Sequence, residues 1–177
     1  MRWLIACILG LTTTFAVADG PVYAEVQFAG AMTSNENLDF YPTFGSVNAG
    51  IYLLPGIGME VFGDLGLEAS SDEGLEMELE GAYGVAARFQ SPGTPGGLQG
   101  YIALGYVNYT LDQRPTGNSG SSNAINEDFG GFRASVGLMQ RLRSNPNLQL
   151  TAEYRHYNAD EPLRIDALLI GLRVNTL

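Results

Sequence analysis

The sequence predicts an all-β fold, an eight-stranded antiparallel up-and-down transmembrane β-barrel. Three observations lead to this prediction: apolar and polar residues alternate along about eight long segments, the connections between segments are alternately short and long, and charges gather on one face of the strands. Most segments approach the roughly 9 to 11 residues that a tilted strand needs to cross a bilayer, whereas ordinary strands average about 5 or 6.

The pattern is clearest in residues 128–157, which form two alternating arms around a polar turn. In the first arm one parity is apolar and the other carries Arg133 and Arg141. In the second arm the apolar parity alternates with one that includes Glu153 and Arg155. This is an antiparallel hairpin with one apolar and one charged face.

Six further segments repeat the alternation: residues 22–30, 43–54, 57–68, 77–90, 98–111 and a last one after residue 163. The segment 57–68 places Glu60, Asp64 and Glu68 on one face, which therefore cannot be an apolar core. Tyr101 and Tyr106 fall on opposite parities of segment 98–111, so the sequence does not show which of its two faces points inward. An even strand number brings the last strand beside the first and closes the sheet.

The connections are of two kinds. Tight turns near Pro55, Gly93 and Asn145 alternate with longer polar stretches near Glu36, Asp72, Asn118 and Asp160. Short turns on one side of the membrane and longer loops on the other are typical of outer-membrane barrels.

Residues 1–18 read as a secretory signal peptide, with Arg2, an apolar run and small residues before a cleavage site after Ala18. Cleavage after Ala24 is the alternative. The barrel domain is then residues 19–177. Removing the signal also removes Cys7, so the mature chain has no cysteine and no disulfide framework.

The composition argues against several classes of partner and ligand. A net charge of −10 argues against a nucleic-acid partner. The acidic run 71–80 lacks the spacing of a calcium loop, and no cofactor or metal site is expected. Every cation is an arginine, whose planar fork pairs well with carboxylates where water is scarce.

The expected inward charges form a network inside the barrel. The interior of an eight-stranded barrel is just wide enough for side chains to fill, so paired charges would plug it; an acidic, cation-selective path is the alternative. The twelve residues are Glu25, Glu60, Asp64, Glu68, Glu78, Glu80, Arg88, Arg133, Arg141, Glu153, Arg155 and Arg173.

The chain resembles the small eight-stranded outer-membrane barrels, the membrane domain of outer-membrane protein A and outer-membrane protein X. Residues 152–158 (AEYRHYN) and 171–175 (GLRVN) also resemble the YfaZ type of barrel. The resemblance implies a monomer in the outer membrane of a Gram-negative bacterium, in contact with outer-membrane lipids and lipopolysaccharide. It also implies insertion by the barrel-assembly machinery, which commonly reads a final aromatic residue where this sequence has Leu177.

His156, the one histidine, falls on the outward parity. Lipid A deacylases of this architecture place a His-x-Ser pair at such a position, whereas this sequence reads His156-Tyr157-Asn158. The hydroxyl nucleophile that acyl transfer needs is missing, and Ser135 lies on the opposite face. No catalytic residue is therefore predicted.

The function expected from the sequence is non-enzymatic: an integral barrel that supports envelope integrity or makes surface contacts, including adhesion, through its extracellular loops. Three alternatives stay open. They are a narrow ion-conducting pore, an enzyme that modifies envelope lipids, and a soluble periplasmic lipocalin-like carrier, which would need an apolar interior.

Overall fold

A computed structural model of the chain describes residues 22–35, 38–68, 70–72, 75–115, 125–158 and 164–176. The expected signal peptide lies outside these residues. None of the described residues forms a helix long and apolar enough to span a membrane.

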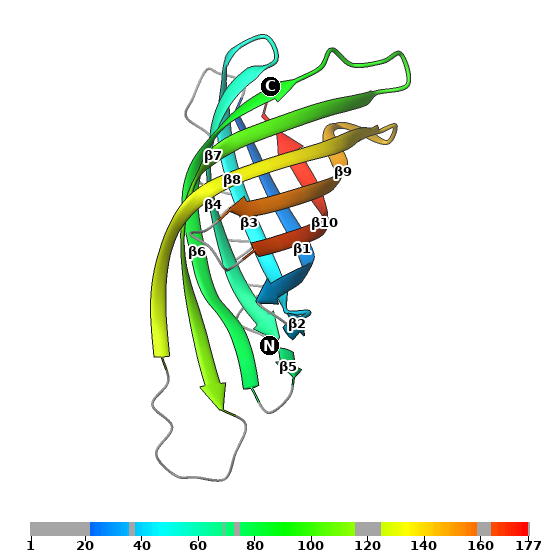
Figure 1. Cartoon of the computed structure of the whole chain (residues 1–177). Coiled ribbons are helices and arrows are strands. Elements are labelled where there is room, and N and C mark those ends of the chain that lie inside the picture. The colour runs from blue at the N-terminus through cyan, green and yellow to red at the C-terminus, as the bar shows by residue number, and fades with distance from the viewer. Residues whose placement is uncertain are drawn as a thin grey trace.

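Eight described strands form one closed antiparallel barrel (Figure 1). Each pairs with its neighbours in sequence, and the last strand pairs with the first, which removes both sheet edges. The predicted fold is confirmed. The strands are β1 (Val22–Asn35), β3 (Thr43–Leu54), β4 (Ile57–Glu68), β6 (Leu75–Gln90), β7 (Leu98–Pro115), β8 (Ile125–Leu142), β9 (Asn145–Asn158) and β10 (Arg164–Asn175).

Two short strands extend hairpins at one end of the barrel. β2 (Leu38–Phe40) pairs with the end of β1, and β5 (Ser70–Asp72) pairs with the start of β6. We call this the loop end, because the four longer connections leave the barrel there.

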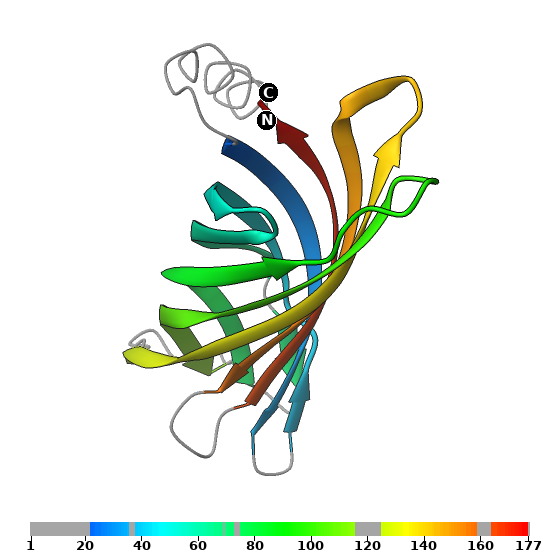
Figure 2. The same cartoon turned by 90° about the horizontal axis from the view of Figure 1, so that it is seen from above.

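The opposite, tight-turn end holds the three short connections. Two of them contain glycines with positive φ, Gly56 at 78° and Gly97 at 84°, a conformation that other residues rarely adopt. Tyr23 pairs with Asn175, so both ends of the described chain also lie at this end. Figure 2 shows the barrel from above, with the sheet curving round to bring β1 beside β10.

The outer face of the barrel is an apolar belt. Large apolar side chains on the outward parity are strongly exposed, for example Leu168 at 69 %, Leu65 at 66 % and Val61 at 58 %. The belt continues on all eight strands, with Val26, Val47, Val85, Ile102, Val136, Leu150 and Ile170 among its members. A continuous apolar surface of this kind is unfavourable in water and matches the hydrocarbon core of a bilayer.

The structure shows which side chains of β7 point inward, a question that the sequence left open. Tyr101, Ala103 and Val107 are buried inside the barrel, whereas Tyr106 is 54 % exposed on the belt. The outward aromatic ring is tolerated because the belt is apolar, so both parities of β7 carry tyrosine.

A charge in the middle of the belt should destabilise the barrel. Val85 lies outward on β6, five residues from the tight-turn end. Val85→Arg should lower the free energy of unfolding by about 2–4 kcal/mol, because an arginine is costly near the bilayer midplane. Urea titration of the barrel refolded into lipid vesicles measures this loss. Asn145→Arg at the exposed start of β9 is the control, and equal losses in the two variants would contradict a lipid-facing belt.

Candidate functional site

The barrel interior holds a balanced set of charges. Four carboxylates and four guanidiniums are buried among the described residues, none more than 4 % exposed. Their formal charges cancel, which removes the acidic excess on which the cation path depended. The set comprises Glu25, Glu60, Asp64, Arg88, Arg133, Glu153, Arg155 and Arg173.

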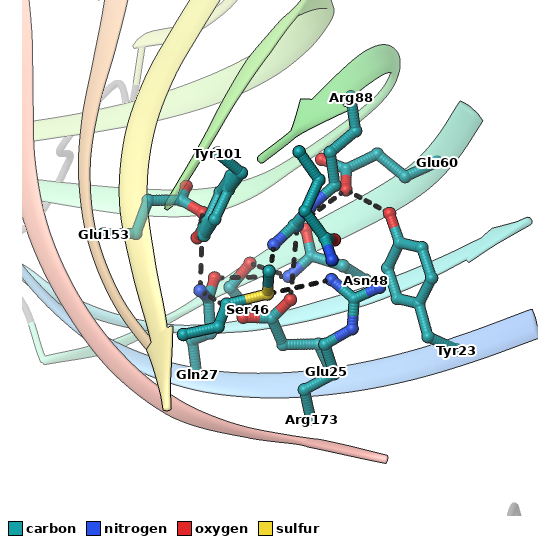
Figure 3. Close-up of polar contacts among 12 residues, drawn as sticks. Tyr23, Glu25, Gln27, Ser46, Asn48, Glu60, Arg88, Tyr101, Glu153 and Arg173 are labelled. Atoms are coloured by element: carbon teal, nitrogen blue, oxygen red, sulfur yellow. Dashed lines mark hydrogen bonds and ion pairs between the residues drawn. The ribbon is translucent and has the colours of Figure 1, made fainter. Parts of the chain in front are cut away.

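Glu60 links two of the arginines. Arg88 Nη1 lies 3.1 Å from Glu60 Oε2 and 3.4 Å from Glu25 Oε2. Arg133 Nη2 lies 3.4 Å from Glu60 Oε1 and 3.4 Å from Glu153 Oε1. These contacts join residues of β1, β4, β6, β8 and β9 across the interior. Figure 3 labels Glu25, Glu60, Arg88 and Glu153 of this set.

Arg155 has the most extensive set of acceptors. Its Nε lies 2.7 Å from Glu153 Oε1 and its Nη1 3.0 Å from Asp64 Oδ1. Nη2 donates to Gln27 Oε1 at 2.8 Å, and Nη1 also donates to Ser46 Oγ. The side chain is fully buried, so these bonds replace the water that the guanidinium loses on folding.

Tyrosine hydroxyls complete the coordination of three of the carboxylates. Each donates a hydrogen bond of 2.5–2.6 Å to a carboxylate oxygen. Such bonds are charge-assisted and stronger than bonds between neutral groups. The pairs are Tyr23 with Glu60, Tyr101 with Glu153, and Tyr157 with Asp64.

Three inward aromatic rings lie against glycines of the next strand. A Cβ atom on any of these glycines would overlap the ring, so the close approach requires glycine. The cross-strand pairs are Tyr23 with Gly50, Phe62 with Gly84, and Tyr101 with Gly137.

Each of the same three rings also carries an arginine. The guanidinium carbon lies 3.4–3.8 Å from the ring centroid, within the range of cation–π attraction. The stacked pairs are Arg173 on Tyr23, Arg133 on Phe62, and Arg88 on Tyr101. The rings thus join the backbone wall to the charge network.

Arg173 closes the network at the tight-turn end. Among the described residues it forms no ion pair with a carboxylate; it donates to Asn175 Oδ1, to the Tyr52 hydroxyl and to the sulfur of Met139. Tyr52 in turn donates to Gln90. Neutral polar groups and aromatic rings therefore surround this charge.

An apolar cluster lines the loop half of the interior on β10, β1 and β3, and we call it the apolar cap. It consists of Ala29, Ala31, Phe44, Ile165, Ala167 and Leu169, none more than 6 % exposed. The sequence analysis expected charges throughout the interior and did not identify this cluster. The signal was present in the inward parity of these apolar residues in the loop halves of β1, β3 and β10.

Three of the twelve expected network residues do not lie in the interior: Glu68, Glu80 and Arg141 are exposed. Glu68 is the last residue of β4, and Arg141 stands beside the tight turn after β8. Glu80 is the extra residue where the β6–β7 register shifts, and such a bulge leaves it out of the ladder. The side chain of Glu78 is not among those that the structure describes. The other eight expected residues are the eight buried charges of the interior.

His156 lies on the outer face near the loop end, in contact with Asp166. Its Nδ1 is 2.8 Å from Asp166 Oδ1, which also accepts a hydrogen bond from the Tyr154 hydroxyl. The carboxylate orients the imidazole, yet the described contacts of His156 bring no serine or threonine hydroxyl to it. Among the described contacts of His156, none supplies the hydroxyl nucleophile that an acyl-transfer site needs.

No protein-family model matches the sequence. No curated protein matches it either.

Solved structures do match. Neisserial surface protein A is 17 % identical with a TM-score of 0.66, over 86 % of this chain and 96 % of that one. Ail of Yersinia pestis, in complex with the heparin analogue sucrose octasulfate, is 12 % identical with a TM-score of 0.65, over 90 % and 100 %. The N-terminal β-barrel domain of OprF from Pseudomonas aeruginosa is 15 % identical with a TM-score of 0.57, over 86 % and 97 %. At these identities the likeness establishes the fold.

Loss of Arg155 should destabilise the barrel strongly. Arg155→Ala leaves Asp64 and Glu153 buried without their main cation, so the free energy of unfolding should fall by about 3–5 kcal/mol. Urea titration and the heat-dependent gel shift of the refolded barrel measure the effect. Arg143→Ala, at an exposed turn, should change stability by no more than about 0.5 kcal/mol. Equal stability of the two variants would contradict a structural role for the network.

Proposed function

We propose that this protein, an eight-stranded β-barrel of the outer membrane, is a closed and non-enzymatic scaffold that makes surface contacts through its loop end. The observation that carries the proposal is a one-sided extension of the sheet beyond the rest of the barrel.

The extension is built by β6, β7 and β8. The β7–β8 ladder continues to the pair Gln113–Ile125, whereas the β8–β9 ladder stops at Phe132–Asn158. Residues 125–131 of β8 thus continue beyond the last pair with β9, a distance of roughly 20 Å at about 3.3 Å per residue. Figure 1 shows these strands reaching past β9 and β10 at the loop end. We call the described residues 70–72, 75–80, 111–115 and 125–128 the projection.

The projection is acidic. The sequence stretches 70–80 and 111–128, which include the projection, contain one arginine, Arg114, and eight acidic residues: Asp72, Glu73, Glu76, Glu78, Glu80, Asp112, Glu127 and Asp128. Complementary potential steers association, so this charge favours a basic partner or one bridged by cations. Ail was solved with a polyanion, and the charge of this projection is opposite to what such a ligand needs.

The interior supports the scaffold role over the pore. Among the described residues the balanced network occupies the barrel interior, and the apolar cap lines the loop half of that interior on β10, β1 and β3. Ions would have to pass this apolar lining and displace paired charges, both of which are unfavourable. The carrier alternative does not fit, because the apolar surface lies outside the barrel and charges lie inside.

The barrel should not conduct ions. The purified protein inserted into planar bilayers should give no discrete current steps above the background of protein-free bilayers, because the network and the cap obstruct the path. Reproducible unitary currents from the wild-type barrel would contradict the closed interior and favour the pore.

Shortening and neutralising the projection should weaken binding of a polycation. In the test variant an Asn-Gly turn replaces residues 111–127 and joins Thr110 to Asp128, which face each other in the ladder. Because this deletion removes only two acidic residues and one arginine, the same variant also carries Asn or Gln in place of Asp72, Glu73, Glu76, Glu78 and Glu80. Wild-type barrel in nanodiscs should bind poly-L-lysine and not heparin, measured by surface plasmon resonance at two salt concentrations. The shortened barrel should bind poly-L-lysine about tenfold more weakly.

Glu68→Gln is the matched control, because Glu68 is exposed at the loop end but lies outside the projection. It should keep most of the poly-L-lysine binding. Tight heparin binding by the wild type, or unchanged poly-L-lysine binding by the shortened barrel, would contradict the proposed contact surface.

A further inference from the structure

A hollow of about 580 Å³ interrupts the apolar belt near the tight-turn end. It spans β4, β6, β7 and β8. Its side walls are the outward apolar residues Ile57, Phe89, Ile102, Val136 and Leu138, between 38 % and 55 % exposed. The hollow is open over most of its extent, so it is a shallow groove in the outer wall and not an enclosed pocket.

The hollow depends on the register of four strands. Ile57 pairs with Phe89, Phe89 with Ile102, and Ile102 with Val136, so these side chains form one row across the outer face. The next outward position toward the tight-turn end of β7 is Gly100, opposite Leu138. A Cβ atom on Gly100 would meet nothing closer than 3.9 Å, so the missing side chain is what gives the hollow its depth.

One edge of the hollow is polar. Ser91 lines it at the tight-turn end, together with the Pro55–Gly56 turn. Gln90 also borders the hollow, but its side-chain oxygen accepts a hydrogen bond from Tyr52 on the inner side of the wall. Ser91 Oγ accepts a hydrogen bond of 2.9 Å from the backbone N–H of Gly100, which holds the hydroxyl at the mouth. No charged side chain lines the hollow among the described residues. Its polarity therefore runs from apolar, toward the middle of the belt, to neutral polar at the barrel rim.

We propose that the hollow is a binding site for one phospholipid of the leaflet at the tight-turn end. An acyl chain lies over Gly100 between Phe89 and Leu138. The glycerol and headgroup lie beside Ser91 and the Pro55–Gly56 turn, at the depth where the bilayer becomes polar.

Two features of the hollow favour a lipid as its occupant. The hollow is continuous with the belt, whose surroundings in a bilayer are acyl chains. Its polarity gradient also has the direction of a phospholipid standing in that leaflet, with the chain toward the membrane centre. The inference depends on membrane insertion and is independent of the contacts proposed for the projection.

Filling the hollow provides the test. Gly100→Leu adds a side chain whose Cβ would make only ordinary van der Waals contacts, and it leaves the Gly100 backbone bonds intact. The matched control is Ala152→Leu, which adds the same bulk at an exposed, outward position on β9. Both variants should show the wild-type heat-dependent gel shift, which verifies folding.

Lipid occupancy is measured in two ways. Barrels are assembled in phosphatidylethanolamine nanodiscs that contain an acyl-chain diazirine analogue, irradiated and analysed by peptide mass spectrometry. Crosslinks should concentrate on Phe89, Ile102 and Leu138 relative to the rest of the belt. Native mass spectrometry after detergent extraction should show one retained phospholipid on the wild type and on Ala152→Leu, and about tenfold less on Gly100→Leu.

Three outcomes would overturn the site. Crosslinks spread evenly over the belt would indicate bulk annular lipid only. Equal lipid retention by Gly100→Leu and the wild type would show that the retained phospholipid does not bind in the hollow. A wild-type dimer in light scattering that Gly100→Leu abolishes would make a second copy of the chain the occupant.

Discussion

The pairing of buried arginines with carboxylates is the constraint on which the rest of this barrel depends. Strands that present an apolar face to lipid must turn their other face inward, and here that face carries four guanidiniums and four carboxylates. Each of these charges has lost its water, so each needs a protein partner. Because the partners come from different strands, the charges hold the wall in one register as well as filling the space inside it.

Glycine and aromatic residues make this pairing geometrically possible. An inward ring such as Tyr101 lies flat against the wall because Gly137 has no side chain, and the ring then supports Arg88. The tyrosine hydroxyl reaches Glu153, so one side chain connects backbone, cation and anion. Repetition of this unit around Tyr23 and, without the hydroxyl, Phe62 leaves the interior packed and polar, with the apolar cap in its loop half.

Because the interior is filled, molecular recognition has to use the outer surfaces of the barrel. The projection extends the sheet at the loop end, and the hollow is a recess within the belt. The two surfaces lie toward opposite ends of the barrel and differ in chemistry, since one is charged and the other is neutral. The barrel between them serves as a rigid support.

The sequence by itself determined the features that depend on neighbouring residues: the alternation, the strand number, the sorting of turns and loops, and the inward parity of residues such as Glu60 and Arg155. Tertiary structure decided what depends on distant strands. The bulge at Glu80 and the position of Arg141 beside a turn removed them from the interior, and pairing with β8 fixed the facing of β7. The hollow over Gly100 requires four strands in register. Alternation is a local property, whereas register is set by contacts between strands, so only the closed barrel could fix it.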